Sequence, residues 1–308
     1  MAAAGELQPG RRHGGRPRLL RRPARPARRA GACARGAAAG GRLHDRDLPV
    51  IVAGGALALA AFVQAFARLR RRGRPDLAGF DRAALFVLGI AIVGVALLSP
   101  LDALAERRLS GHMLQHVLIG DVAPALLVVA LRGPLTFFLL PPAVLKRVAR
   151  IATLRSLLGW LLRPRVAFAI WMLALGLWHV PLAYDYALAH PLAHDAEHLS
   201  FMTAGLLVWM QLVDPARRRV LGRSGRLAFA CCLFVPGQVL AGVLLGSPVP
   251  LYASYASVGD QQLAGLVMLV EQATSLGACA AFLLPVVPRI PERNRGRLLV
   301  RHPVRVAD

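Results

Sequence analysis

Seven apolar runs, each long enough to cross a membrane as a helix, constrain this chain more than any other feature. A hydrocarbon layer of roughly 30 Å is crossed by about 20 apolar residues in helical form. Backbone polar groups in lipid must be paired within their own segment, so each run is predicted to be a helix. The runs are Leu48–Ala67, Ala83–Leu101, His112–Leu131, Val166–Leu182, His194–Val213, Leu227–Leu245 and Leu263–Val287. The sequence therefore predicts an all-α polytopic membrane protein, a bundle of about seven transmembrane helices in the lipid bilayer.

The basic residues alternate between connections, and this alternation predicts the orientation of the chain. From the first connection onward, successive connections carry 6, 2, 7, 0, 5, 0 and 6 Lys and Arg residues. Cytoplasmic loops hold the excess of these residues, so the C-terminus is predicted to be cytoplasmic. The formal net charge of +22 would indicate nucleic acid binding in a soluble chain. Here the cations lie in a tail and in alternate loops, so no nucleic acid partner is predicted.

Three regions follow from this pattern. Residues 1–47 hold 12 Arg residues and are predicted to be a disordered basic segment. Residues 48–287 form the seven-helix transmembrane domain, and residues 288–308 form a basic cytoplasmic tail. Seven spans place the N-terminus outside, which conflicts with its 12 cations. All four tyrosines lie in the two connections without cations, and we expect them to form an aromatic belt at the outer surface.

Histidines are concentrated in one part of the chain, because six of the nine lie between Gly111 and Leu199. Residues four apart share a helix face, so His112 can act with His116, and His194 with His198. Pro191 is expected in the first helical turn, which leaves His190 outside the helix. A further histidine, His179, ends another apolar run. The predicted topology places all of these residues on the extracytoplasmic side, and no Lys or Arg lies between Val166 and Asp214.

Acidic residues complete the candidate site. Asp260 begins the last run on the same predicted side, and Glu271 lies near the middle of the bilayer, where an acidic residue marks a functional site by default. A hydrogen-bonded carboxyl packed between helices is the alternative for Glu271. Asp121 lies about 140° around the helix from His116 at 100° per residue, so it is not a simple third ligand. Imidazoles together with a carboxylate suit copper, zinc or iron. The predicted metal ligands are His112, His116, His179, His194, His198 and Asp260.

Four sequence motifs carry a resemblance to a known family. In chain order they are HMLQHVLIGDVAPALLV, LWHVPLAYDYAL, HDAEHLSFMTAGLLVW and DQQLAGLVM. Together they resemble the polytopic CtaG family of bacterial cytochrome c oxidase assembly factors, over roughly Leu48 to Val287. The resemblance implies a multi-pass protein of the bacterial plasma membrane, which acts with cytochrome c oxidase subunits in maturation of a haem-copper oxidase. It also implies that the family histidines fall on His112, His116, His179, His194 and His198, with Asp260 and Gln261 from the last helix.

One departure from the family pattern lies in the last helix. After DQQLAGLVM the family pattern continues with an aromatic and Pro-Gly stretch, whereas this chain has Leu269-Val270-Glu271-Gln272. The lower part of this helix is therefore expected to behave differently.

These observations lead to one functional prediction and two alternatives. We expect a non-enzymatic assembly factor that binds or delivers a copper ion through an extracytoplasmic histidine cluster. A haem-binding redox protein is the first alternative, because paired histidines on adjacent helices can ligate haem. A metal or proton transporter is the second, and its deep polar candidates are Glu271, Gln238 and Asp121.

Overall fold

The computed structural model describes residues 28–133 and 135–284, with side chains from residue 48 onward. By their contacts the residues form two units, Met1–Arg46 and Asp47–Asp308, and the following account concerns the second. Residues 1–27 of the predicted basic segment and the predicted tail 288–308 lie outside the described residues. Residues 28–47 of that segment belong to the first helix, α1 (Arg28–Arg71).

Every regular element among the described residues is helical, as predicted. The apolar runs lie in α1, α2 (Phe80–Leu98), α4 (Leu109–Val117), α5 (Ala123–Ala130), α9 (Pro164–Trp178), α11 (Pro191–Val213), α12 (Arg223–Gly246) and α13 (Val258–Leu283). Shorter elements connect them: η1 (Pro75–Leu77), α3 (Pro100–Ala105), η2 (Leu118–Val122), α6 (Leu135–Phe138), α7 (Pro142–Arg150), α8 (Ala152–Leu161) and α10 (Pro181–Ala189).

Five helical segments among the described residues are long and apolar enough to cross a membrane. They are Leu48–Arg71, Pro75–Leu98, Leu109–Ala130, Arg223–Gly246 and Val258–Leu283. The pair α8 and α9, bent by 71°, adds a sixth if it is counted as one span. The remaining predicted run lies in α11, which has 23 residues but begins with a polar stretch, HDAEH. The prediction of a polytopic helical membrane protein is confirmed. The polar residues of α11 would be costly in contact with lipid, so they are expected to pack against other helices.

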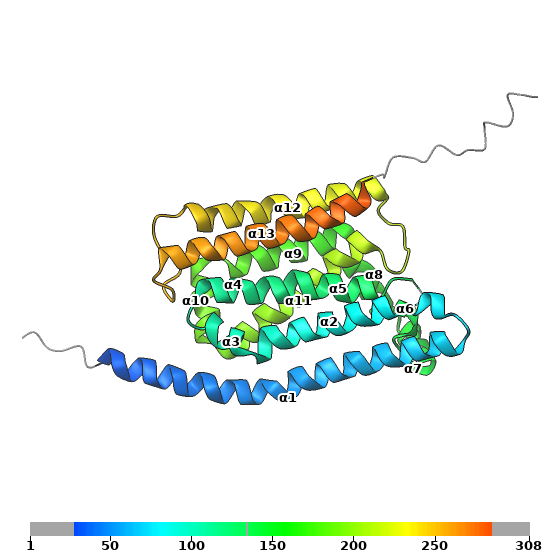
Figure 1. The fold of residues 1–308 in the computed structure, drawn as a ribbon, viewed down its shortest axis with the longest axis horizontal. Helices are drawn as coiled ribbons and strands as arrows, with labels where there is room; N and C mark the ends of the chain where they lie inside the picture. Colours follow the sequence, from blue (N-terminus) through cyan, green and yellow to red (C-terminus); the bar gives the residue numbers. More distant parts are fainter. Residues whose placement is uncertain (1–27, 134, 285–308) are drawn as a thin grey trace, which may run out of the picture. The chain divides into compact units, whose positions relative to one another are not determined.

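Close helix contacts surround α11 and α13. Figure 1 shows α12 and α13 side by side, and α13 also contacts α4, while α11 contacts α9 and η2. A Cβ atom added at Gly205 of α11 would overlap the carbonyl oxygen of Gly120, and one at Gly265 of α13 would lie 2.8 Å from the carbonyl oxygen of Ala241. Small residues permit this close approach of helix backbones in membranes. The approach at Gly205 holds α11 against the third apolar run.

The third apolar run is not one continuous α-helix. Between α4 and α5 the chain forms one π-helical turn, η2, immediately before Pro124 in the first turn of α5. Proline lacks the N–H that would continue the α-helical hydrogen bonds, and π-helical turns inside α-helices are frequent at functional sites. The wider turn changes the rotation of Asp121 relative to His116 from the value expected for a regular helix.

Candidate metal centre

Two helices bring four histidine rings into contact. His112 and His116 come from α4, and His194 and His198 come from the first turns of α11. The ring centroids are 4.3 Å apart for His112 and His116, 5.3 Å for His112 and His194, and 4.2 Å for His194 and His198. The pair His116 and His198 closes the set at 5.4 Å. We refer to these four residues as the imidazole cluster.

Two overlapping groups of side chains in this region could hold a metal ion. One group is His112, His194 and His198, and the other is His112, His116 and Glu197; within each group the ligand atoms lie within 4.8 Å of one another. Glu197 was not among the predicted ligands. Its spacing of three from His194 places both residues on one helix face, and this signal could have identified it. Because His112 belongs to both groups, it is the central residue of the cluster.

A tyrosine fixes the protonation of His112. The hydroxyl of Tyr255 donates to the carbonyl oxygen of Ala105 at 2.6 Å and lies 3.2 Å from Nδ1 of His112. Since the single hydroxyl proton is used at Ala105, Nδ1 of His112 must be the donor to Tyr255. Nε2 of the neutral ring then carries the lone pair. Hydrogen bonds of this kind orient metal-binding histidines in known sites.

Several polar atoms of the cluster region have no hydrogen-bond partner among the described residues. They include Nδ1 of His116, Nε2 of His198 and Oε1 of Glu197, all of them buried. Oε1 of Glu197 lies 3.6 Å from Nε2 of His116, beyond hydrogen-bond distance. Each buried polar atom without a partner costs roughly 1–3 kcal/mol. A bound cation would engage these lone pairs, and no Lys or Arg lies between Val166 and Asp214 to compete with it.

Tyrosines cover the cluster instead of forming the predicted belt. Tyr184, Tyr252 and Tyr255 are buried, and only Tyr186, at 55% exposure, has the accessibility expected of a belt residue. The ring of Tyr184 lies 5.2 Å from that of His112. The belt prediction is wrong for the three buried residues, because the hydroxyls of Tyr252 and Tyr255 find backbone partners inside the protein.

The loop that carries two of these tyrosines is fixed by Asp185 of α10. Its carboxylate accepts hydrogen bonds from the backbone N–H groups of Ala253 and Ser254 at 3.1 and 3.0 Å. Burial raises the pKa of the Tyr252 and Tyr255 hydroxyls above their usual range, so both remain neutral donors. None of the sequence motifs indicated that tyrosines would cover the cluster.

His179 lies beside the cluster but in neither ligand group. Its Nδ1 donates to the carbonyl oxygen of Leu175 at 2.8 Å, so the lone pair of the neutral ring is on Nε2, which is buried and has no partner in the described part of the chain. The His179 ring lies 6.5 Å from that of His116. Both residues line a cavity of about 80 Å³ that extends toward Asp121 and Glu271.

Asp260 and Gln261 have positioning contacts. The carboxylate of Asp260 accepts from the backbone N–H of Leu109 at 2.7 Å and from the hydroxyl of Ser110 at 2.6 Å, at the N-terminus of α4. Acidic side chains stabilise helix N-termini in this way. The side chain of Gln261 accepts from the backbone N–H of Leu251 at 2.8 Å. The structure therefore places Asp260 at the start of α4 and outside both ligand groups.

His190 lies outside α11, as predicted, and it also lies outside the imidazole cluster. It precedes Pro191, the first residue of α11, and its exposed ring stacks on Tyr186 at 3.9 Å. The end of α9 is joined to α11 by a hydrogen bond from the indole of Trp178 to Ser200 at 2.8 Å. This bond sets the position of His179 relative to the cluster.

The comparisons with known proteins agree with the sequence motifs. The family model described as cytochrome c oxidase caa3 assembly factor (Caa3_CtaG) matches residues 60–287. Comparisons with curated proteins and with solved structures gave no match. The matched range begins within α1 and extends past the end of α13, so it includes all the helices of the imidazole cluster. The chain belongs to the family of cytochrome c oxidase caa3 assembly factors.

Proposed function

We propose that this chain binds one copper ion in the imidazole cluster and makes it available to a cytochrome c oxidase subunit during assembly. The observation that carries the proposal is the close approach of the nitrogen atoms of His112, His194 and His198, within 4.8 Å of one another. Family membership supplies the assembly role. The ion is cargo, so no catalytic turnover is part of the proposal.

The donor atoms support a metal ion of this class. Neutral imidazoles and a carboxylate suit copper, zinc and iron, and copper is the one of these that a haem-copper oxidase receives as a separate ion. His112 would supply Nε2, with Tyr255 holding its Nδ1–H. Glu197 would supply a negative charge that offsets the charge of the ion. Because His112 is common to both ligand groups, we expect one ion per chain.

We propose that the cluster lies at the extracytoplasmic face. The helix ends that carry it adjoin the connections with the fewest cations, whereas the connections at their other ends carry seven and five. A copper-delivery site on this face would be accessible to a recipient subunit outside the cytoplasm. Cysteine accessibility mapping of single-cysteine variants in intact cells would test this orientation.

Metal titration of the purified protein tests the proposal directly. The metal-depleted protein in detergent would be titrated with Cu⁺ against a chromogenic chelator, and separately with Cu²⁺ and Zn²⁺. We expect one tightly held copper ion, lost in His112→Ala and kept in the control His190→Ala, whose ring lies outside the cluster. Equal copper binding by both variants would contradict the assignment of the site.

A deletion strain tests the role in assembly. We expect loss of oxidase activity that added copper restores at least in part, because the proposed defect is in supply of the ion. Loss of activity that copper does not relieve would indicate a scaffold role instead.

The ring contacts favour an ion over a porphyrin. A haem held between two histidines must fit its plane between the rings, whereas the rings of His194 and His198 are 4.2 Å apart at their centroids. A Soret band in the purified protein would overturn this preference.

A further inference from the structure

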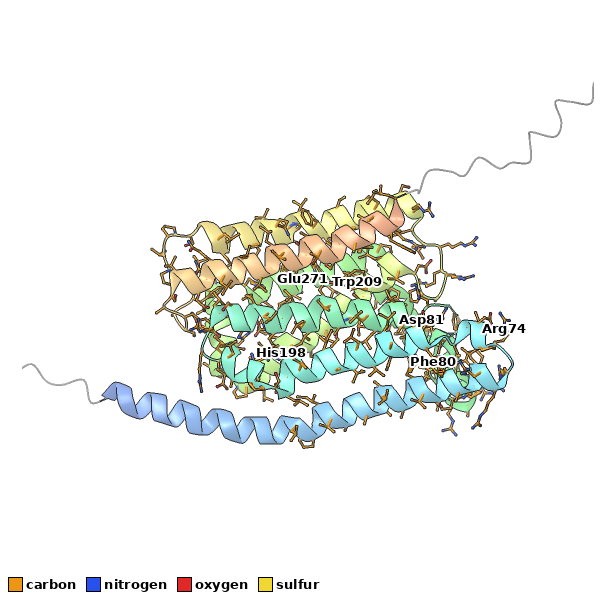
Figure 2. All side chains as sticks on the ribbon, viewed as in Figure 1. Arg74, Phe80, Asp81, His198, Trp209 and Glu271 are labelled. Carbon is orange, nitrogen blue, oxygen red and sulfur yellow. The ribbon has the colours of Figure 1, made fainter. Side chains whose placement is uncertain are left out.

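Two carboxyl groups that do not belong to the imidazole cluster meet inside the bundle. Asp121 of η2 and Glu271 of α13 line the same cavity, and their carboxyl groups lie within hydrogen-bonding reach of each other. Asp121 also accepts from the indole N–H of Trp209 and, at 3.0 Å, from the hydroxyl of Ser275. Figure 2 labels two of the residues that contact Asp121, Glu271 on α13 and Trp209 on α11.

This contact requires a proton. Ionised carboxylates only accept hydrogen bonds, so two of them cannot bond to each other. Both oxygens of Asp121 already accept from Trp209 and Ser275, which favours the ionised form of Asp121. The proton therefore lies on Glu271, which donates it to Asp121. The pair carries one negative charge in total.

A cavity places this pair next to the imidazole cluster. The cavity of about 80 Å³ is lined by Asp121 and Glu271 at one part and by His116 and His179 at another. Oε1 of Glu271 is buried and has no hydrogen-bond partner among the described residues. The lining contains Gln272 but no Lys or Arg. Among the described residues, Cys279 on α13 is a further titratable group near Asp121, and Arg226 of α12 lies near Cys279.

We propose that Asp121 and Glu271 hold one exchangeable proton, and that a cation entering the imidazole cluster releases this proton through the cavity. The proposal rests on the proposed metal binding of the cluster. A nearby cation favours the ionised form of a carboxyl group, and this effect is strong where protein excludes water. The leaving proton passes to water, and no bond other than the O–H of Glu271 is broken. The pair would thus limit the positive charge that accumulates inside the bundle when the ion is bound.

Counting protons tests the coupling. Cu²⁺ would be added to the metal-depleted protein in weakly buffered detergent solution, and the released protons would be measured with a pH indicator. We expect Glu271→Gln to bind Cu²⁺ as the wild type does but to release about one proton fewer per bound ion. The glutamine side chain can still donate to Asp121, which preserves the packing. The matched control is Glu106→Gln, because Glu106 is exposed on the chain outside the pair.

Infrared difference spectroscopy tests the shared proton itself. We expect a protonated carboxyl band in the metal-free wild type at neutral pH, its loss in Glu271→Gln, its shift in Asp121→Asn, and its decrease when Cu²⁺ binds. Equal Cu²⁺ binding with equal proton release by the wild type and Glu271→Gln would overturn this inference and leave the proposed function intact. Absence of the band would overturn it as well. Absence of Cu²⁺ binding by the wild type would instead overturn the proposed function, and the coupling with it.

Discussion

Polar groups at the two ends of α11 are paired in different ways. At the C-terminal end, Asp214 accepts hydrogen bonds from the backbone N–H groups of Arg218 and Arg219 at 2.7 and 2.9 Å, and it forms an ion pair with Arg226 at 3.1 Å. At the N-terminal end, His198 and Glu197 retain buried atoms without hydrogen-bond partners among the described residues. The charge of Asp214 is therefore neutralised by Arg226 at the C-terminal end, whereas acceptor atoms at the N-terminal end have no donor among the described residues.

This difference separates a structural contact from a binding site. A buried polar group that only stabilises a fold is expected to be satisfied by the protein, because an unsatisfied group costs free energy. Under the proposed function, the buried atoms of His116, Glu197 and His198 that have no hydrogen-bond partner among the described residues would receive the missing contact from a bound ion. Substitutions at the two ends of α11 and at the residues that contact the cluster test this difference.

The largest effect is expected for His112→Ala. This change removes a ligand from both groups, so we expect the affinity for copper to fall by more than about 100-fold, since loss of an orienting partner alone costs roughly 10–100-fold. Competition with a copper chelator measures the change. Affinity within a few-fold of the wild type would show that the open lone pairs are not ligands.

Tyr255→Phe should have the next largest effect. It removes the hydroxyl that accepts from Nδ1 of His112, and we expect copper affinity to fall by roughly 10–100-fold with the ligands intact. The control is Tyr186→Phe, because that residue is exposed and outside the cluster. Equal affinities for the two variants would mean that the hydrogen bond does not orient the ring.

At the other end of α11, Asp214→Asn should lower stability and leave copper binding unchanged. The substitution weakens the contact with Arg226, and we expect a loss of roughly 1–3 kcal/mol in the free energy of unfolding. Thermal unfolding in detergent and a parallel copper titration measure the two quantities. A loss of copper affinity comparable to that of Tyr255→Phe would show that the two ends are coupled.

The smallest effect is expected for Asp260→Ala. Because Asp260 caps α4, its loss should cost about 1 kcal/mol of stability and reduce copper affinity by less than about tenfold. The same titration and thermal measurements apply. A loss of affinity as large as that of His112→Ala would instead support ligation by Asp260.

The sequence predicted the helices well, because lipid imposes both their length and their internal hydrogen bonding. It also predicted the pairs His112 with His116 and His194 with His198, since helical spacing alone places each pair on one face. The cover by Tyr255 and the cap by Asp260 depend on contacts between residues about 150 positions apart in the chain. Spacing within one helix carries no information about such contacts.

The pairing of Asp121 with Glu271 illustrates the same limit. The sequence indicated that each residue was a deep polar candidate, but the π-helical turn and the approach of α13 bring them together. The sequence therefore identified both residues as candidates, but it did not predict that their carboxyl groups lie close together.

Gly205 has a consequence for how mutations could inactivate this protein. Because even a methyl group there would meet the Gly120 carbonyl, replacement by alanine would push apart the two helices that hold the imidazoles. A single added carbon, outside the imidazole cluster, would then disrupt the proposed copper site while every proposed ligand remained in the sequence.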